Sequence, residues 1–124
     1  MRVAAGSAVY AFVADLVDEG PGEVGDYLVT RGFSGVTLAT VYHAARDLLP
    51  HNPKQVVAHR TEGVHYFESN PGMYPNELRP PAQAASLSAD FGRVTNALAD
   101  RRLDWQAWTV YLHNCQLAAG HPEY

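Results

Sequence analysis

Residues 8–14 read AVYAFVA and residues 36–42 read VTLATVY. The first run is apolar at successive positions, which is typical of a strand covered on both faces in a parallel sheet. The second is rich in the β-branched and aromatic residues that suit a pleated surface. These two runs predict neighbouring strands in the first half of the chain.

The segment between the two runs predicts a helix at residues 21–31. Gly20-Pro21-Gly22 interrupts the chain, and Pro21 suits a first helical position because its missing N–H would be unpaired there anyway. Val24, Tyr27 and Leu28 recur on one helical face, and Gly32 can adopt the left-handed conformation that ends a helix. A helical crossover of this kind is almost always right-handed, so we expect the two strands to be parallel.

The rest of the chain predicts a hairpin, a second helix and a third strand. Residues 56–59 and 64–67 flank a turn containing Gly63, residues 86–102 carry an apolar stripe at helical spacing, and residues 105–112 predict a third strand. The expected fold is α/β: a partial (β/α) barrel-like parallel sheet of three strands in the order 1-2-3, with two crossover helices and a β-hairpin insertion. One domain covers residues 1–124.

The composition argues against two classes of binding partner, nucleic acids and membranes. The chain has 124 residues and a formal net charge of −4, which argues against the basic surface that nucleic acid or an anionic membrane requires. No apolar run approaches the roughly 20 residues that cross a bilayer. The single cysteine, Cys115, cannot form an internal disulfide and has no evident base nearby. We therefore expect a cytoplasmic protein with no cofactor.

Polar residues follow each predicted strand. Asp15, His43 and His113-Asn114 come directly after the three apolar runs, and the loop after the second strand adds His51 and Asn52. The carboxyl ends of parallel strands form the functional surface in barrels and open sheets alike. Polar groups beside aromatic rings are suited to carbohydrate, since sugars present hydroxyls at their edges and C–H groups on their faces. Trp108 and Tyr111 line this site or fill the core, depending on the face they occupy.

Structural interpretations of the same residues stay open. Asp15 can cap the turn that follows its strand, and His43 and His113 can be hydrogen-bonded residues at a sheet terminus. A metal-dependent hydrolase with these two histidines as ligands is a weaker alternative, because no histidine pair has the i, i+4 spacing of a helical zinc motif. No metal is expected.

Three segments resemble the amino-terminal part of bacterial glycoside-hydrolase-like TIM-barrel proteins. They are GVTLATVYH at 35–43, LPHNP at 49–53, and WTVYLHN at 108–114 followed by HPE at 121–123 and Tyr124. In that pattern the second strand ends in Tyr-His, a proline-rich loop follows, and the third strand leads into His-Pro-Glu and an aromatic residue. The resemblance implies a carbohydrate-active hydrolase. Together with the places of these residues near the predicted strand ends, it makes the following the expected substrate contacts: Asp15, Tyr42, His43, His51, Asn52, His113 and Asn114.

The chain departs from that family in length. A complete eight-stranded barrel needs about 250 residues, and the acid and base of barrel glycosidases usually lie on the fourth and later strands. We therefore expect sugar contacts without the catalytic pair, and no glycosidase activity in the isolated chain. The alternative is a stand-alone α/β binding module. In either case the third strand is an unprotected edge through which an isolated chain is expected to self-associate.

Overall fold

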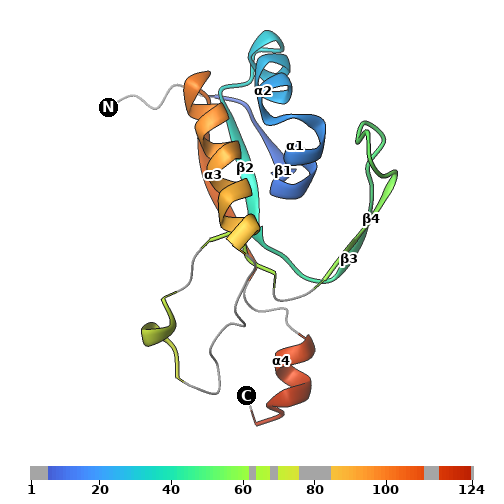
Figure 1. Ribbon diagram of the computed structural model, residues 1–124, viewed down its shortest axis with the longest axis vertical. Helices are drawn as coiled ribbons and strands as arrows, with labels where there is room; N and C mark the ends of the chain where they lie inside the picture. The colour runs from blue at the N-terminus through green and yellow to red at the C-terminus, as the bar shows by residue number, and fades with distance from the viewer. Residues whose placement is uncertain (1–5, 62–63, 68–69, 76–84, 111–114, 124) are drawn as a thin grey trace.

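The computed structural model describes residues 6–61, 64–67, 70–75, 85–110 and 115–123. Three parallel strands, β1 (Ala8–Phe12), β2 (Gly35–Val41) and β5 (Asp104–Thr109), form one sheet in the order β1-β2-β5. The predicted α/β class, the parallel pairing and the strand order are confirmed. In the part of the chain that is described, these strands form an open sheet and not a closed barrel (Figure 1).

Two helices, not one, connect β1 to β2. The helix α1 (Val13–Glu19) begins directly after β1, and α2 (Pro21–Thr30) follows it after Gly20. The prediction that the strand continues to residue 14 is wrong, because Val13 and Leu16 are buried at helical spacing against the sheet. Asp15 therefore lies in the first turn of a helix and not at the end of a strand. The helix dipole stabilises a carboxylate at that position.

Glycine and proline punctuate the first crossover as the sequence predicts. Gly20 has a φ of +92° between the two helices, and Pro21 is the first residue of α2. Gly32 has a φ of +81°, and the N–H of the next residue, Phe33, donates to the carbonyl of Leu28. This is the hydrogen bond of a Schellman motif, which ends α2 and turns the chain into β2.

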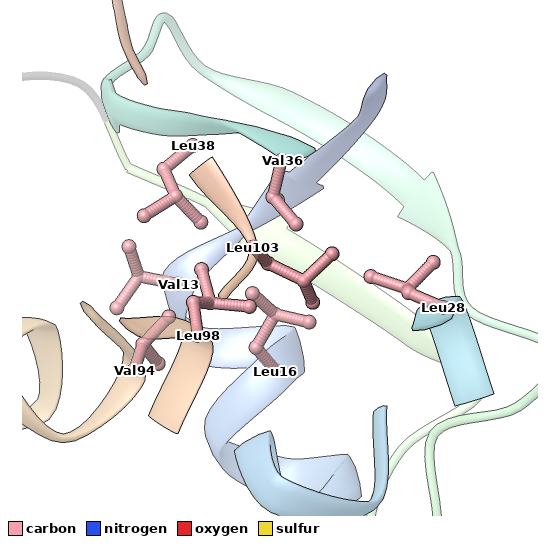
Figure 2. Close-up of a cluster of buried hydrophobic side chains, with 8 residues drawn as sticks. All are labelled: Val13, Leu16, Leu28, Val36, Leu38, Val94, Leu98 and Leu103. Atoms are coloured by element: carbon pink, nitrogen blue, oxygen red, sulfur yellow. The ribbon is translucent and has the colours of Figure 1, made fainter. Parts of the chain in front are cut away.

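The helices α1, α2 and α3 (Ala85–Asp100) pack on one face of the sheet, called here the covered face (Figure 1). Figure 2 shows the core that they form with β2, in which eight buried side chains point toward one another. The core residues are Val13, Leu16, Leu28, Val36, Leu38, Val94, Leu98 and Leu103. The apolar stripe predicted at residues 86–102 thus supplies the helical wall of this core.

The opposite face of the sheet is called the open face. Strand alternation and the observed register put Tyr10, Phe12, Thr37, Ala39 and Trp108 on it. Of the two places that the sequence left open for Trp108, the site and the core, the structure excludes the core on the covered face. Trp105 lies on the covered face, where it meets Phe91 of α3, and is still 43% exposed; Trp108 is 36% exposed on the open face.

The hairpin lies elsewhere than predicted. Its strands are β3 (Ala45–Leu48) and β4 (Val57–Arg60), paired antiparallel, and not residues 56–59 with 64–67. Residues 45–48 read ARDL, which carries no alternating strand signal, and they form a strand by pairing with β4. His65, expected in the second hairpin strand, instead makes an isolated bridge to Val41 of β2. The hairpin reaches away from the three-stranded sheet in Figure 1.

The remaining elements are short. A 3-10 turn, η1 (Pro71–Met73), precedes α3, and α4 (Cys115–Gly120) follows β5. β5 ends at Thr109, three residues earlier than predicted, after a register shift opposite Ala39 and Val41. No helix in the described ranges has the length and apolar character needed to cross a membrane.

Candidate functional site

A cavity of about 220 Å³ lies at the carboxyl ends of β1 and β2. Phe12, the last residue of β1, and Tyr42, which follows β2, form its sheet side. β4 and the segment after it form the other side, including Arg60 and Tyr66. We call this cavity the hairpin pocket. Its position is the edge of the sheet where the sequence predicts a site.

Aromatic rings connect this pocket to the open face. The rings of Phe12 and Tyr42 meet edge to face with centroids 5.2 Å apart, and Tyr42 meets Trp108 in the same way at 5.1 Å. Trp108 in turn contacts Tyr10 across the sheet, again at 5.1 Å. Edge-to-face packing of this kind holds the rings in fixed positions.

Arg60 is the main polar group of the hairpin pocket. Its guanidinium carbon lies 3.4 Å from the centre of the Phe12 ring, and its Nε donates a hydrogen bond to Asp47 across the hairpin. The side chain is only 12% exposed, and its Nη2 atom is buried with no hydrogen-bond partner among the described residues. Buried donors are nearly always paired, so we expect Arg60 Nη2 to bind an acceptor that the described residues do not supply.

Tyr42 and His43 lie together at the end of β2. Tyr42 lines the hairpin pocket, and the His43 ring stacks on it with centroids 4.2 Å apart. The His43 Nδ1 donates to the carbonyl of Ala44 at 2.7 Å. His43 therefore covers one face of the Tyr42 ring and helps to hold the ring in place.

Asp15 and Asn52 also come together, but as a structural clamp outside the hairpin pocket. The Asn52 amide nitrogen donates to Asp15 at 2.6 Å and to Asp18 at 3.2 Å. Its carbonyl oxygen accepts the backbone N–H groups of Lys54 and Gln55 at 2.9 and 3.1 Å. Asn52 is buried and both of its polar atoms are engaged, so it fixes the loop before β4 onto α1.

Lys54 strengthens the same clamp. Its Nζ lies 2.6 Å from the Asp18 carboxylate. This hydrogen bond, helped by Asn52, lowers the pKa of Asp18 below its ordinary value, and burial of the carboxyl opposes the shift only in part. Asp18 is therefore ionised at neutral pH and held as a structural partner.

His51 lies beside a different hollow of about 320 Å³, together with Glu19 and Glu23 of α1 and α2 and with Tyr27. Burial raises the pKa of Glu19, the charge of Asp15 adds to this rise, and His51 opposes it. The predicted site residues are therefore divided among the hairpin pocket, the Asn52 clamp and this hollow. His113 and Asn114, and the undecided Tyr111, lie outside the described residues.

Sequence reasoning missed Arg60 and Asp47 because both were assigned to other structures. The turn predicted between residues 59 and 64 includes Arg60, and the sequence predicts no strand at residues 45–48. No alternation of polar and apolar residues marks either strand, since residues 45–48 read ARDL and residues 57–60 read VAHR.

The described lining of the hairpin pocket contains no aspartate or glutamate. In the described ranges, no group of three or more histidine, cysteine, aspartate or glutamate side chains has the arrangement of a metal site. The pocket thus offers rings, amides and a guanidinium, which bind and orient a ligand.

No known family is identified for this chain. It matches no protein-family model, and no curated protein and no solved structure is significantly similar to it. The functional argument therefore depends on the geometry of the pocket and on the residues that form it.

Proposed function

We propose that this chain is the amino-terminal, carbohydrate-contacting part of a glycoside-hydrolase-like barrel, and that it binds a sugar in the hairpin pocket. The observation that carries the proposal is the set of three rings, Phe12, Tyr42 and Tyr66, around a cavity at the carboxyl edge of the sheet. Apolar walls with a few convergent polar groups are what small-molecule sites have in common.

The arrangement of helices supports the barrel part of the proposal. In a (β/α) barrel every crossover helix lies outside and the other face of each strand points inward. Here all three sheet-packed helices lie on the covered face, so the open face corresponds to the barrel interior. We also propose, as the sequence predicts, that the protein is located in the cytoplasm.

The described pocket residues bind sugar in this proposal and do not hydrolyse it. Glycosidases need two carboxyl groups, about 5–5.5 Å apart for retention and about 6.5–9.5 Å apart for inversion. The described lining has none, and Asp15 is committed to Asn52. Isolated protein should therefore show no turnover of aryl glycosides. Turnover abolished by Asp15→Asn or Glu123→Gln would contradict this assignment.

Titration of the chain with a panel of mono- and disaccharides, followed by calorimetry or amide chemical shifts, tests binding. We expect at least one sugar to bind and Tyr42→Ala to weaken its binding about tenfold or more, a loss of about 1.4 kcal/mol. Tyr27→Ala is the matched control, because Tyr27 is an exposed tyrosine on α2 outside the pocket. Absence of binding across the panel, or equal effects of the two variants, would refute the proposal.

A second candidate function is self-association of a binding module through β5. Among the described strands β5 pairs with β2 alone, and its residues are largely exposed. The N–H groups of Asp104 and Val110 point to β2, so alternation directs those of Trp105, Ala107 and Thr109 to the free edge. An unprotected edge of this kind pairs readily with another strand.

Ala107→Pro tests the second candidate, because proline removes an outward N–H and leaves the bonds to β2 in place. We expect sedimentation to show association of the unchanged chain at micromolar concentration and a shift of Ala107→Pro toward monomer. A stable monomer of the unchanged chain would remove this candidate.

A further inference from the structure

The charge of the hairpin pocket differs from that of the whole chain. The chain carries thirteen acidic and nine basic residues, whereas the described pocket lining has Arg60 and His59 as its ionisable acid–base side chains apart from tyrosines, and no carboxylate. The nearest acidic partner, Asp47, is already hydrogen-bonded to the Arg60 Nε. The described lining thus presents a guanidinium and no carboxylate, which favours an anionic ligand over a cationic one.

The unpaired nitrogen of Arg60, Nη2, is the donor to which we assign the anion. Arg60 Nη2 is buried and has no described acceptor, while Nε of the same group is engaged by Asp47. Leaving a buried donor unpaired is unfavourable, and more so for a charged group. A carboxylate satisfies a guanidinium better than a neutral hydroxyl does, because charge-assisted hydrogen bonds are about twice as strong as neutral ones.

Tyr66 is compatible with the same ligand. It lines the pocket, and burial raises the pKa of its hydroxyl above the ordinary value of 10.0, which the charge of Arg60 only partly offsets. Its hydroxyl is therefore protonated at neutral pH. A protonated hydroxyl can donate to a carboxylate, which an ionised phenolate would repel.

The size of the pocket limits the ligand to about one ring. Pockets for drug-sized ligands begin at roughly 300 Å³, and the hairpin pocket measures about 220 Å³. Phe12 is not a free stacking face, because the Arg60 guanidinium covers it. Tyr42 remains as the ring beside which a single sugar unit can lie.

We propose that the hairpin pocket recognises a carboxylate-bearing sugar, a hexuronate unit, with its carboxylate at Arg60 Nη2 and its ring beside Tyr42. This inference rests on the proposed carbohydrate function and names the class of sugar. Asp47 positions the guanidinium through Nε, and the hexuronate supplies the second carboxylate that the buried guanidinium lacks.

The test compares matched acidic and neutral sugars on the same protein. Digalacturonate and the corresponding neutral galactose disaccharide are titrated into the chain at low salt. We expect the acidic sugar to bind about tenfold tighter or more, and Arg60→Gln to remove this preference by weakening the binding of the acidic sugar about tenfold more than that of the neutral sugar. Arg101→Gln is the control, since Arg101 forms a comparable pair with Asp26 away from the pocket.

A second variant guards against misfolding of Arg60→Gln, which leaves Asp47 without its partner. Asp47→Asn keeps a side-chain oxygen that can accept the hydrogen bond from Arg60 Nε and so hold the guanidinium in place, but it removes the competing negative charge. This variant should therefore bind digalacturonate as tightly as the unchanged chain or more tightly. Equal binding of both sugars, or weaker uronate binding in Asp47→Asn with the fold intact, overturns the inference and leaves the carbohydrate function standing. Binding of neither sugar, nor of any other in the panel, refutes the carbohydrate function and the inference with it.

Discussion

The two faces of the three-stranded sheet are built by the same strands and are buried in different ways. On the covered face, Val36 and Leu38 are 1% and 0% exposed beneath three helices. On the open face, Thr37 and Ala39 of the central strand are also buried, while Tyr10 at the edge is 68% exposed. The covered face is thus buried by tertiary packing, and the centre of the open face by aromatic side chains of the neighbouring strands.

The difference explains where a site can form. A close-packed core has no space for a ligand, and each of its side chains is held by several neighbours. On the open face small residues of β2 lie between Tyr10 and Trp108, and Gln106 donates to Thr37 at 2.7 Å. Such a surface has exposed rings and polar groups in fixed positions, which are the elements of a binding site.

The largest effect expected from this comparison is in the core of the covered face. Leu98→Ala removes a fully buried side chain and should reduce the free energy of unfolding by about 2–5 kcal/mol. Denaturant unfolding followed by circular dichroism measures the loss. Leu48→Ala is the control, because Leu48 is exposed on the hairpin. If Leu98→Ala had no greater effect than Leu48→Ala, the covered face would not be the stabilising core.

An intermediate effect is expected at the clamp that joins α1 to the loop before β4. Asn52→Ala removes the hydrogen bonds to Asp15 and to two backbone N–H groups and one of those to Asp18, which keeps Lys54, so we expect a loss of about 1–3 kcal/mol. Hydrogen exchange should show faster exchange of the Lys54 and Gln55 amides and little change in α3. Equal acceleration in α3 would mean that the clamp supports the whole core.

A smaller, pH-dependent effect is expected at Asp18. Its pKa is lowered in the folded protein, chiefly by Lys54, so its stabilising contribution is fully present above the unfolded pKa and is lost as pH falls through the folded pKa. The destabilisation caused by Asp18→Asn should therefore be present at pH 7, begin to decrease near the ordinary value of 3.8 and disappear below the lowered pKa of the folded protein. Unfolding curves between pH 7 and pH 2 measure this. In a Lys54→Met background the pH dependence should shrink, and an unchanged dependence would refute this cause.

The smallest effect is expected on the open face. Tyr10→Ala removes a largely exposed ring and should change the free energy of unfolding by less than about 0.5 kcal/mol. The same denaturant experiment measures it. A loss as large as that of Leu98→Ala would show that the open face is packed against another part of the chain, and would erase the difference between the two faces.

Elements with local signals were predictable. The residue pattern of 36–42 identifies β2, and the spacing of the apolar stripe identifies α3. Pro21 and Gly32 mark the two ends of α2, because the backbone geometry at each end depends on that one residue. The first strand shows the limit of this reasoning. Val13 and Leu16 suit a buried strand and a buried helix face equally well by composition, and packing against the sheet selects the helix.

The candidate site was predictable in position and only partly in residues. Tyr42 lies in the pocket at the expected sheet edge, but Asp15 and Asn52 bind each other instead. Arg60 was missed because its importance depends on Asp47, thirteen positions away, and on Phe12 in another strand. Contacts of this kind leave no periodic signal in the chain.

Local sequence patterns are sufficient for the α/β class, the parallel strands and their order, because periodicity, helix-ending residues and the handedness of crossovers are properties of short segments. Long-range packing sets which strand pairs with residues 45–48, which carboxylates Asn52 holds, and which nitrogen of Arg60 remains unpaired. These features depend on side chains that are distant in sequence and meet only when the core has formed. The hairpin pocket, and the chemistry proposed for it, belongs to this second group.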